Sequence, residues 1–249
     1  MKSARSLLAT LIACAAIAAP TTALARTYTA GAEATFAPFE SLNQKREVVG
    51  FDADIIAAIG KKTGLDIKMV NTPWEGLFMS LNNGDIDIAA SAITITPDRQ
   101  KTMDFSQPYF EAQQLIVVPE GSKVATLSDL KGKKIGVQTG TTGDIVSQNA
   151  FGKTTPDIRR YESITLAMQE LRDGGLQAVV GDNAVVKNYL KNNPGAKFKL
   201  VDDKSFKKEY YGIAVRKGNK QLLDQINKGL GAIKADGTYQ TIYGKYFGK

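Results

Sequence analysis

Apolar and polar positions along the chain form two alternating kinds of segment. Short apolar runs predict strands over 28–32, 65–70 and 86–90. Between them, apolar residues at helical spacing predict helices over 51–63 and 74–83, which Gly64 and Gly84 are suited to end. Alternation of this kind indicates an α/β fold.

The same alternation restarts after a turn at 119–122. Strands are predicted over 115–118, 134–138, 177–180 and 211–215. Helices are predicted from Asp144, from Ser163 to Arg172, and in two C-terminal segments separated near 236–237. In both halves an apolar strand ends in polar residues, and ligands of open α/β sheets bind at the carboxyl ends of strands. The pattern therefore predicts two lobes that face one cleft.

The first 25 residues are interpreted as a targeting signal. Lys2 and Arg5 precede an apolar run over 7–19, which is too short to span a bilayer as a helix. Residues 23–25 fit a cleavage site, so we expect an exported, soluble chain that begins near Arg26. The alternative is a lipoprotein cleavage that leaves Cys14 lipidated.

Composition removes several classes of function. The chain has a net charge of +7, and loss of Lys2 and Arg5 leaves 30 basic and 25 acidic residues, a charge of +5. These charges form no basic block, so nucleic-acid binding is not predicted. The chain has no histidine, and its one cysteine, Cys14, lies in the signal. Histidine-based triads and common zinc sites are excluded, and neither a metal nor a cofactor is expected.

The segment 91–99 contains the most informative candidate chemistry. Thr96 is a suitable N-cap and Pro97 a suitable first helical residue, which places Arg99 in the first turn of a helix. The helix dipole disfavours a cation there, so we infer a guanidinium aimed at an anion. With the hydroxyls and carbonyls of 91–94, this arginine could hold the carboxylate and ammonium of an amino acid. The alternative is a surface arginine paired with Asp98 or Asp104.

Two further segments carry polar groups at predicted strand ends. The loop 139–143 joins a strand to a helix, where glycines and free N–H groups suit an anion, although an ordinary turn has the same pattern. Asp182 follows a buried strand and is either a counter-ion for an ammonium or the N-cap of the next helix.

Three residues near strand ends are candidates for enclosing a ligand. Glu33 and Phe36 follow the first strand, and Trp74 begins a helix after Pro73. The rings could stack on a ligand or hold a cation, and they could equally fill the core.

Taken in order, the motifs of the chain resemble a known family, the polar amino-acid-binding proteins of ABC importers among the bacterial extracellular solute-binding proteins, family 3. The resemblance covers 28–247. The segments that carry it are 36–40 (FAPFE), 49–54 (VGFDAD), 84–87 (GDID), 94–99 (TITPDR), 103–106 (MDFS), 129–133 (DLKGK), 136–143, and 237–247.

The resemblance implies an α/β periplasmic-binding-protein fold of type II, with two hinge strands and a ligand cleft between the lobes. Lobe 1 would comprise 26–112 and 211–249, and lobe 2 would comprise 113–210. It also implies a periplasmic monomer that closes on one L-amino acid and delivers it to a membrane permease.

Eleven residues would surround the ligand, in four groups. The α-carboxylate would be held by Arg99, helped by Thr142 and nearby backbone N–H groups. The α-ammonium would be held by Asp182, the Thr94 hydroxyl and the Ala92 carbonyl. The side chain would be flanked by Phe36 and Trp74. Its far end would be lined by Glu33, Ser91, Gln138 and Thr141.

The far end of this pocket predicts the ligand class. An acid at Glu33 with no lysine opposite it, at Gln138, favours arginine or lysine. Glutamine or histidine remains an alternative, because a carboxylate also accepts an amide or imidazole N–H. A dehydratase on the same fold is a less favoured alternative, because it would need a general acid in the cleft, and a receptor domain is a third.

Overall fold

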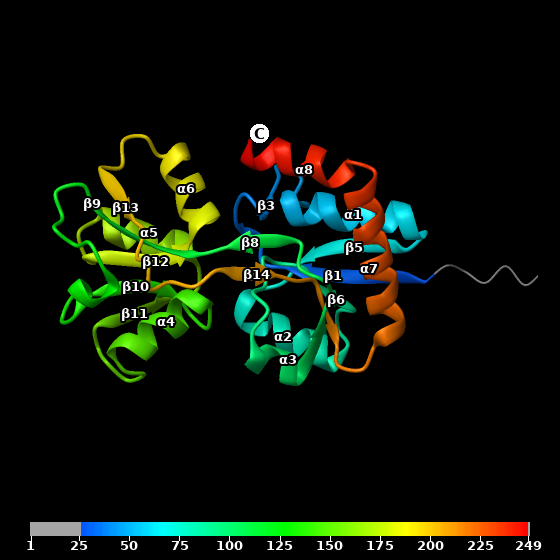
Figure 1. Cartoon of the computed structure of the whole chain (residues 1–249), viewed down its shortest axis with the longest axis horizontal. Helices are drawn as coiled ribbons and strands as arrows, with labels where there is room; N and C mark the ends of the chain where they lie inside the picture. Colours follow the sequence, from blue (N-terminus) through cyan, green and yellow to red (C-terminus); the bar gives the residue numbers. More distant parts are fainter. Residues whose placement is uncertain (1–25, 249) are drawn as a thin grey trace, which may run out of the picture.

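The computed structural model describes residues 26–248, so the predicted signal and Cys14 lie outside the described residues. Two five-stranded sheets, each with helices on both faces, form two lobes side by side, as Figure 1 shows. The predicted α/β class and the two-lobed architecture are confirmed.

The first lobe is built around a sheet of strand order β5-β1-β6-β15-β7, to which both ends of the chain contribute. Its strands are β1 (Thr27–Ala32), β5 (Asp66–Asn71), β6 (Ile88–Ala89), β7 (Met103–Phe105) and β15 (Ala214–Arg216). Its helices are α1 (Phe51–Thr63), α2 (Trp74–Asn83), α3 (Pro97–Thr102), α7 (Lys220–Ala235) and α8 (Thr238–Phe247). Helices α1, α7 and α8 pack together on one side, and α2 and α3 lie on the other. Because β1 runs parallel to β5 and β6, the carboxyl ends of these strands meet at one edge.

The second lobe repeats this design with a sheet of order β11-β10-β12-β9-β13. Its strands are β9 (Gln114–Pro119), β10 (Ile135–Gln138), β11 (Ile158–Tyr161), β12 (Ala178–Asp182) and β13 (Phe198–Val201). Its helices are α4 (Thr142–Phe151), α5 (Ile164–Arg172), α6 (Asn183–Asn192) and a short 3₁₀ helix (Leu127–Leu130). Strand β10 runs parallel to β11 and β12, so their carboxyl ends also share an edge.

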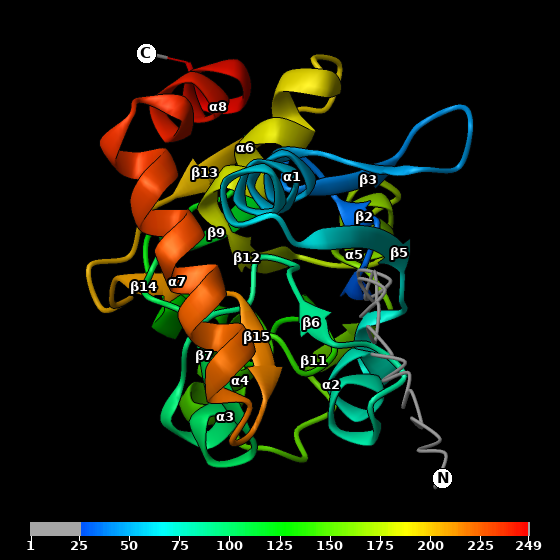
Figure 2. The same ribbon diagram turned by 90° about the vertical axis from the view of Figure 1, so that its right-hand side faces the viewer.

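Two paired strands run between the lobes. Strand β8 (Phe110–Ala112) pairs antiparallel with β14 (Glu209–Tyr211), and both pass through the middle of Figure 1. The predicted boundary after 112 falls at the end of β8, and the one before 211 falls within β14; both remain predictions. The view in Figure 2 shows α7 running alongside the first sheet towards α8 at the C-terminal end.

Local signals placed most helix ends correctly. Helix α1 ends at Gly64 and α2 at Gly84, both in the left-handed conformation that glycine adopts at little cost. The Thr96 and Ser163 hydroxyls cap α3 and α5 as predicted. Helix α4 begins at Thr142 rather than at Asp144, because the Thr141 hydroxyl accepts the Asp144 N–H and acts as its N-cap.

Several strands differ from the sequence prediction. The strand predicted over 211–215 is divided into β14 and β15, because the chain passes there from the inter-lobe pair into the first sheet. Gly212 lies at this passage, where a Cβ atom would come within 2.9 Å of the Ile95 side chain. The strand predicted over 86–90 is shortened to Ile88–Ala89. The small sheet of β2 (Thr35–Phe36), β3 (Glu40–Leu42) and β4 (Val48–Val49) was not predicted, because runs of two or three residues show no periodicity.

Candidate functional site

A cavity of about 290 Å³ lies where the strand ends of the two lobes face each other. All eleven predicted site residues line it. They are Glu33, Phe36, Trp74, Ser91, Ala92, Thr94, Arg99, Gln138, Thr141, Thr142 and Asp182. The structure therefore brings the whole predicted set together, while the role of each residue remains a prediction.

Arg99 is held in the cleft wall by backbone carbonyls and aromatic rings. Its Nη1 donates to the Thr94 carbonyl at 2.8 Å, and its Nη2 donates to the Gly140 carbonyl at 3.2 Å. Its Cζ lies 5.3 Å from the ring centre of Trp74 and 5.2 Å from that of Phe78. Burial lowers the pKa of Arg99 to about 10, so the guanidinium stays charged at neutral pH.

No carboxylate in the described range 26–248 forms an ion pair with Arg99. The alternative of a surface pair with Asp98 or Asp104 is wrong, because Asp98 pairs with Lys101 and Asp104 with Lys217. A half-buried cation in a cavity wall, with no carboxylate in an ion pair with it, is suited to an anionic ligand group.

Asp182 is a buried carboxylate at the end of β12. It accepts hydrogen bonds from the Tyr211 hydroxyl and, at 2.8 Å, from Gln114 Nε2. Asp182 does occupy the N-cap position of α6, as the alternative predicted, but its side chain makes no capping bond there. Burial, strengthened by the nearby charge of Glu209, raises the pKa of Asp182 to about 6. A ligand cation at this position would favour the ionised carboxylate.

The backbone at Ala92 has a conformation that is rare for a residue with a side chain. Its φ is 46°, and its N–H donates to Asp52 Oδ2 at 2.7 Å. Asp52 is fully buried and also accepts the Tyr109 hydroxyl at 2.8 Å. These contacts fix the turn in which the Ala92 carbonyl and the Ser91 hydroxyl border the cavity.

Asp52 lies in a buried polar group with Glu40. Glu40 Oε1 accepts the Ser91 hydroxyl at 2.8 Å, and Ser91 Oγ in turn accepts the Glu33 N–H at 3.0 Å. Within 26–248, Glu40 Oε2 and Asp52 Oδ1 have no hydrogen-bond partner. Burial and the neighbouring Asp52 charge raise the pKa of Glu40 well above its ordinary value, which favours its protonated form.

The far end of the cavity is formed by Glu33 and Gln138. Gln138 Nε2 donates to Glu33 Oε2 at 2.7 Å and to the Glu162 carbonyl at 3.0 Å, and the Thr35 hydroxyl donates to Glu33 Oε1 at 2.6 Å. Burial raises the pKa of Glu33. Gln138 Oε1 is buried and has no hydrogen-bond partner among residues 26–248. A charged acceptor and an unused amide oxygen suit a ligand group rich in N–H donors.

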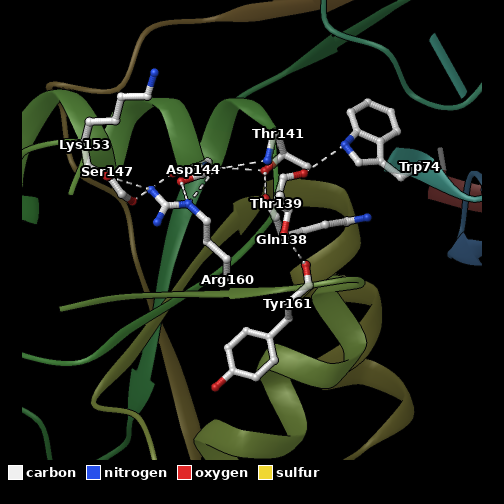
Figure 3. A network of polar contacts seen from close by, with 11 residues as sticks. Trp74, Gln138, Thr139, Thr141, Asp144, Ser147, Lys153, Arg160 and Tyr161 are labelled. Carbon is white, nitrogen blue, oxygen red and sulfur yellow. Dashed lines mark hydrogen bonds and ion pairs between the residues drawn. The ribbon is translucent and has the colours of Figure 1, made fainter. Parts of the chain in front are cut away.

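Direct hydrogen bonds join the two lobes across the cleft. Trp74 Nε1 donates to the Thr139 carbonyl at 3.0 Å, a contact drawn in Figure 3. The Arg99–Gly140 and Gln138–Glu33 bonds cross the same gap. The Thr141 hydroxyl, by contrast, donates to the Gln138 carbonyl and caps α4, so it is committed within its own lobe. The structure is therefore a closed form of the cleft.

Three residues beside the site were missed by the sequence analysis, namely Gln114, Glu209 and Tyr211. Gln114 is a polar residue at the start of an apolar run, and this gave a weak signal. Glu209 and Tyr211 lie on the inter-lobe strand β14, and nothing in that segment of the sequence indicates a role at the site.

Comparisons with known proteins agree with this architecture. The chain is 46% identical over 233 residues to a "Probable histidine-binding protein" of Neisseria gonorrhoeae, covering 93% of this chain and 87% of that protein. It is 38% identical over 221 residues to "ABC transporter arginine-binding protein 1" of Escherichia coli (strain K12), covering 87% of this chain and 89% of that protein.

A solved structure shows the same likeness in three dimensions. The arginine-, lysine-, histidine-binding protein ArtJ from Geobacillus stearothermophilus superposes with a TM-score of 0.86 at 44% identity, covering 90% of this chain and 96% of that chain. The family model of these proteins matches residues 28–249. The chain thus belongs to the bacterial extracellular solute-binding proteins, family 3.

Proposed function

We propose that this protein is the periplasmic substrate-binding component of an amino-acid ABC importer, and that it binds a polar L-amino acid, with arginine or lysine favoured. The observation that carries the proposal is the placement of opposite charges across one small cavity, namely the half-buried Arg99 guanidinium and the buried Asp182 carboxylate. Arg99 comes from the first lobe and Asp182 from the second, and no described residue forms an ion pair with either.

A zwitterion satisfies both charges at once. Its α-carboxylate would meet the Arg99 guanidinium, and its α-ammonium would meet Asp182 and the Ala92 carbonyl. Because the two charges lie on different lobes, a bound amino acid bridges the lobes and stabilises the closed form. The lobe boundaries that we propose for this motion are 26–112 with 211–249, and 113–210.

The far end of the cavity supports a cationic side chain. Glu33 and the unused Gln138 Oε1 are both acceptors, and the rings of Phe36 and Trp74 line the path towards them. Arginine offers five N–H donors and lysine three. Glutamate would place two negative charges together. Histidine and glutamine are the second candidates within the same function, and the histidine-binding relative favours testing histidine first.

We propose that the protein catalyses no reaction. No acidic group in or beside the cavity is poised as a general acid next to a reactive group. Each accepts hydrogen bonds from neighbouring residues, and these groups are Glu33, Glu40, Asp52, Asp182 and Glu209. We further propose that residues 1–25 are a cleaved export signal, and that the mature protein is a monomer that delivers its ligand to a permease. Within 26–248, no helix is both long and apolar enough to cross a membrane.

The test is calorimetry of the ligand-stripped protein against a panel of L-amino acids. Tightest binding of arginine or lysine, weaker binding of histidine and glutamine, and none of glutamate are expected. Binding of no amino acid, together with consumption of a cyclic or hydroxylated acid, would refute the proposal in favour of a dehydratase.

A further inference from the structure

Glu209 lies on β14, between the lobes, and its carboxylate contacts ligand-site residues of both. Its Oε2 accepts the Thr94 hydroxyl at 2.9 Å and the Thr142 hydroxyl at 2.7 Å. Gln114 Nε2 lies 3.4 Å from both of its oxygens. We propose that Glu209 is a positioning residue that fixes both threonine hydroxyls as hydrogen-bond acceptors towards the cavity, and so makes the site specific for ligands with an α-ammonium.

The number of hydrogens on each threonine hydroxyl limits what it can offer a ligand. A threonine hydroxyl has one hydrogen to donate and two lone pairs that accept. In this structure Thr94 and Thr142 both donate that hydrogen to Glu209. The Thr142 hydroxyl also accepts from Gln114 Nε2 at 3.0 Å, which occupies one of its lone pairs. Both threonines line the cavity, so the groups that they still offer a ligand are lone pairs, two on Thr94 and one on Thr142. Lone pairs attract an ammonium and repel a carboxylate.

The orientation of the two hydroxyls gives the ligand carboxylate and the ligand ammonium different partners. The hydroxyl of Thr142 is committed to Glu209 and has no hydrogen left for a ligand carboxylate, so the carboxylate depends on the Arg99 guanidinium and on nearby backbone N–H groups. The ammonium is left with acceptors on several sides, namely Asp182, the Ala92 carbonyl and the oriented hydroxyl of Thr94. The inference rests on the proposed function, because it assumes a zwitterionic ligand.

The negative charge of Glu209 also favours a ligand with an α-ammonium. Gln114 Nε2 bonds to Asp182 at 2.8 Å while it also approaches Glu209, which places two carboxylates around one amide. The charge of Glu209 helps to raise the pKa of Asp182. An α-ammonium relieves this repulsion, whereas a ligand without an amino group leaves it in place.

The test compares arginine with 5-guanidinopentanoate, which has the same guanidinium and carboxylate but no amino group. In Glu209→Ala, arginine should bind about tenfold more weakly, which corresponds to the loss of one hydrogen bond to a charged group. Binding of 5-guanidinopentanoate should stay unchanged or tighten. Glu209→Gln should keep more of the preference for arginine, because its amide oxygen still accepts the hydroxyls.

Glu111→Gln is the matched control. Glu111 lies on the partner strand β8, opposite Tyr210, and pairs with Lys208 at the surface, so neither ligand should be affected. Combining Glu209→Ala with Thr94→Val should cost arginine little more than Thr94→Val alone, because Glu209 acts partly through that hydroxyl.

Equal weakening of both ligands in Glu209→Ala would show a merely structural role and overturn the inference, as would no change in either. A wild-type protein that binds no L-amino acid would instead refute the proposed function. The two failures are therefore distinguishable.

Discussion

Glu33→Gln isolates the charge of the proposed side-chain subsite. The substituted amide can keep both local contacts of the carboxylate. Its oxygen can accept from Gln138 Nε2, and its NH₂ group can donate to the Thr35 hydroxyl, which is free to reverse its role. The shape of the cavity and the bond between the lobes are preserved, while the negative charge is lost.

The magnitude follows from the kind of hydrogen bond. A bond to a charged group contributes about 1.5–3 kcal/mol, and a neutral one about 0.5–1.5 kcal/mol. A loss of about 1–2 kcal/mol for a cationic side chain corresponds to roughly five- to thirty-fold weaker binding. Glutamine carries no charge to lose, so its affinity should change less than about threefold.

Calorimetry with arginine, lysine and glutamine, on wild type and variant, measures these differences. Glu75→Gln is the matched control, because Glu75 is exposed on the first turn of α2 beside Trp74. It removes the same charge outside the cavity and should leave all three affinities unchanged. If Glu33→Gln weakens glutamine as much as arginine, the charge argument is wrong.

The same variant should also change how the preference for arginine over glutamine depends on pH. Burial raises the pKa of Glu33, so its protonation begins at a higher pH than for an ordinary glutamate. Arginine binding favours the ionised carboxylate, and its affinity relative to glutamine should therefore fall as the pH is lowered. Protonation of Asp182 affects both ligands alike and cancels in this ratio. In Glu33→Gln the ratio should be independent of pH, and a persistent slope would contradict the assignment.

Three further predictions concern the rest of the site. Arg99→Ala removes one partner of a buried charge pair, at a cost of about 2–5 kcal/mol, so calorimetry should show roughly thirty-fold or greater weakening of arginine but not of agmatine, its decarboxylated analogue. Trp74, the only tryptophan, donates across the cleft, so its emission should change on titration with ligand, and constant emission during heat-producing binding would refute closure around it. Burial raises the pKa of Glu40, so folding favours its protonated form, and stability falls as the pH rises from the ordinary glutamate pKa through the raised one. Glu40→Gln cannot ionise and should flatten this decline in the urea midpoint.

Local signals predicted the elements that each lobe is made of. Helix periodicity, the Thr96 cap and the stops at Gly64 and Gly84 act within one or two turns, so they are visible in a single segment. Very short strands such as β6 were predicted with wrong limits, because pairing rather than propensity decides where they end.

The residues of the candidate site were predicted through the family resemblance. The hydrogen bonds between them were not. Thr94 and Glu209 are 115 positions apart, and Trp74 and the Thr139 carbonyl are 65 apart, so no local pattern links them. Which hydroxyl donates, and to which carboxylate, depends on the approach of the two lobes.

By itself, the sequence determined the α/β class, the two halves, and the polar strand ends that would face one another, because periodicity and capping are properties of neighbouring residues. The tertiary structure alone decided that Gln114, Glu209 and Tyr211 surround Asp182, and that buried Asp52 holds the Ala92 turn. The physical reason is burial, since it determines which charges lose water and must find partners elsewhere in the chain.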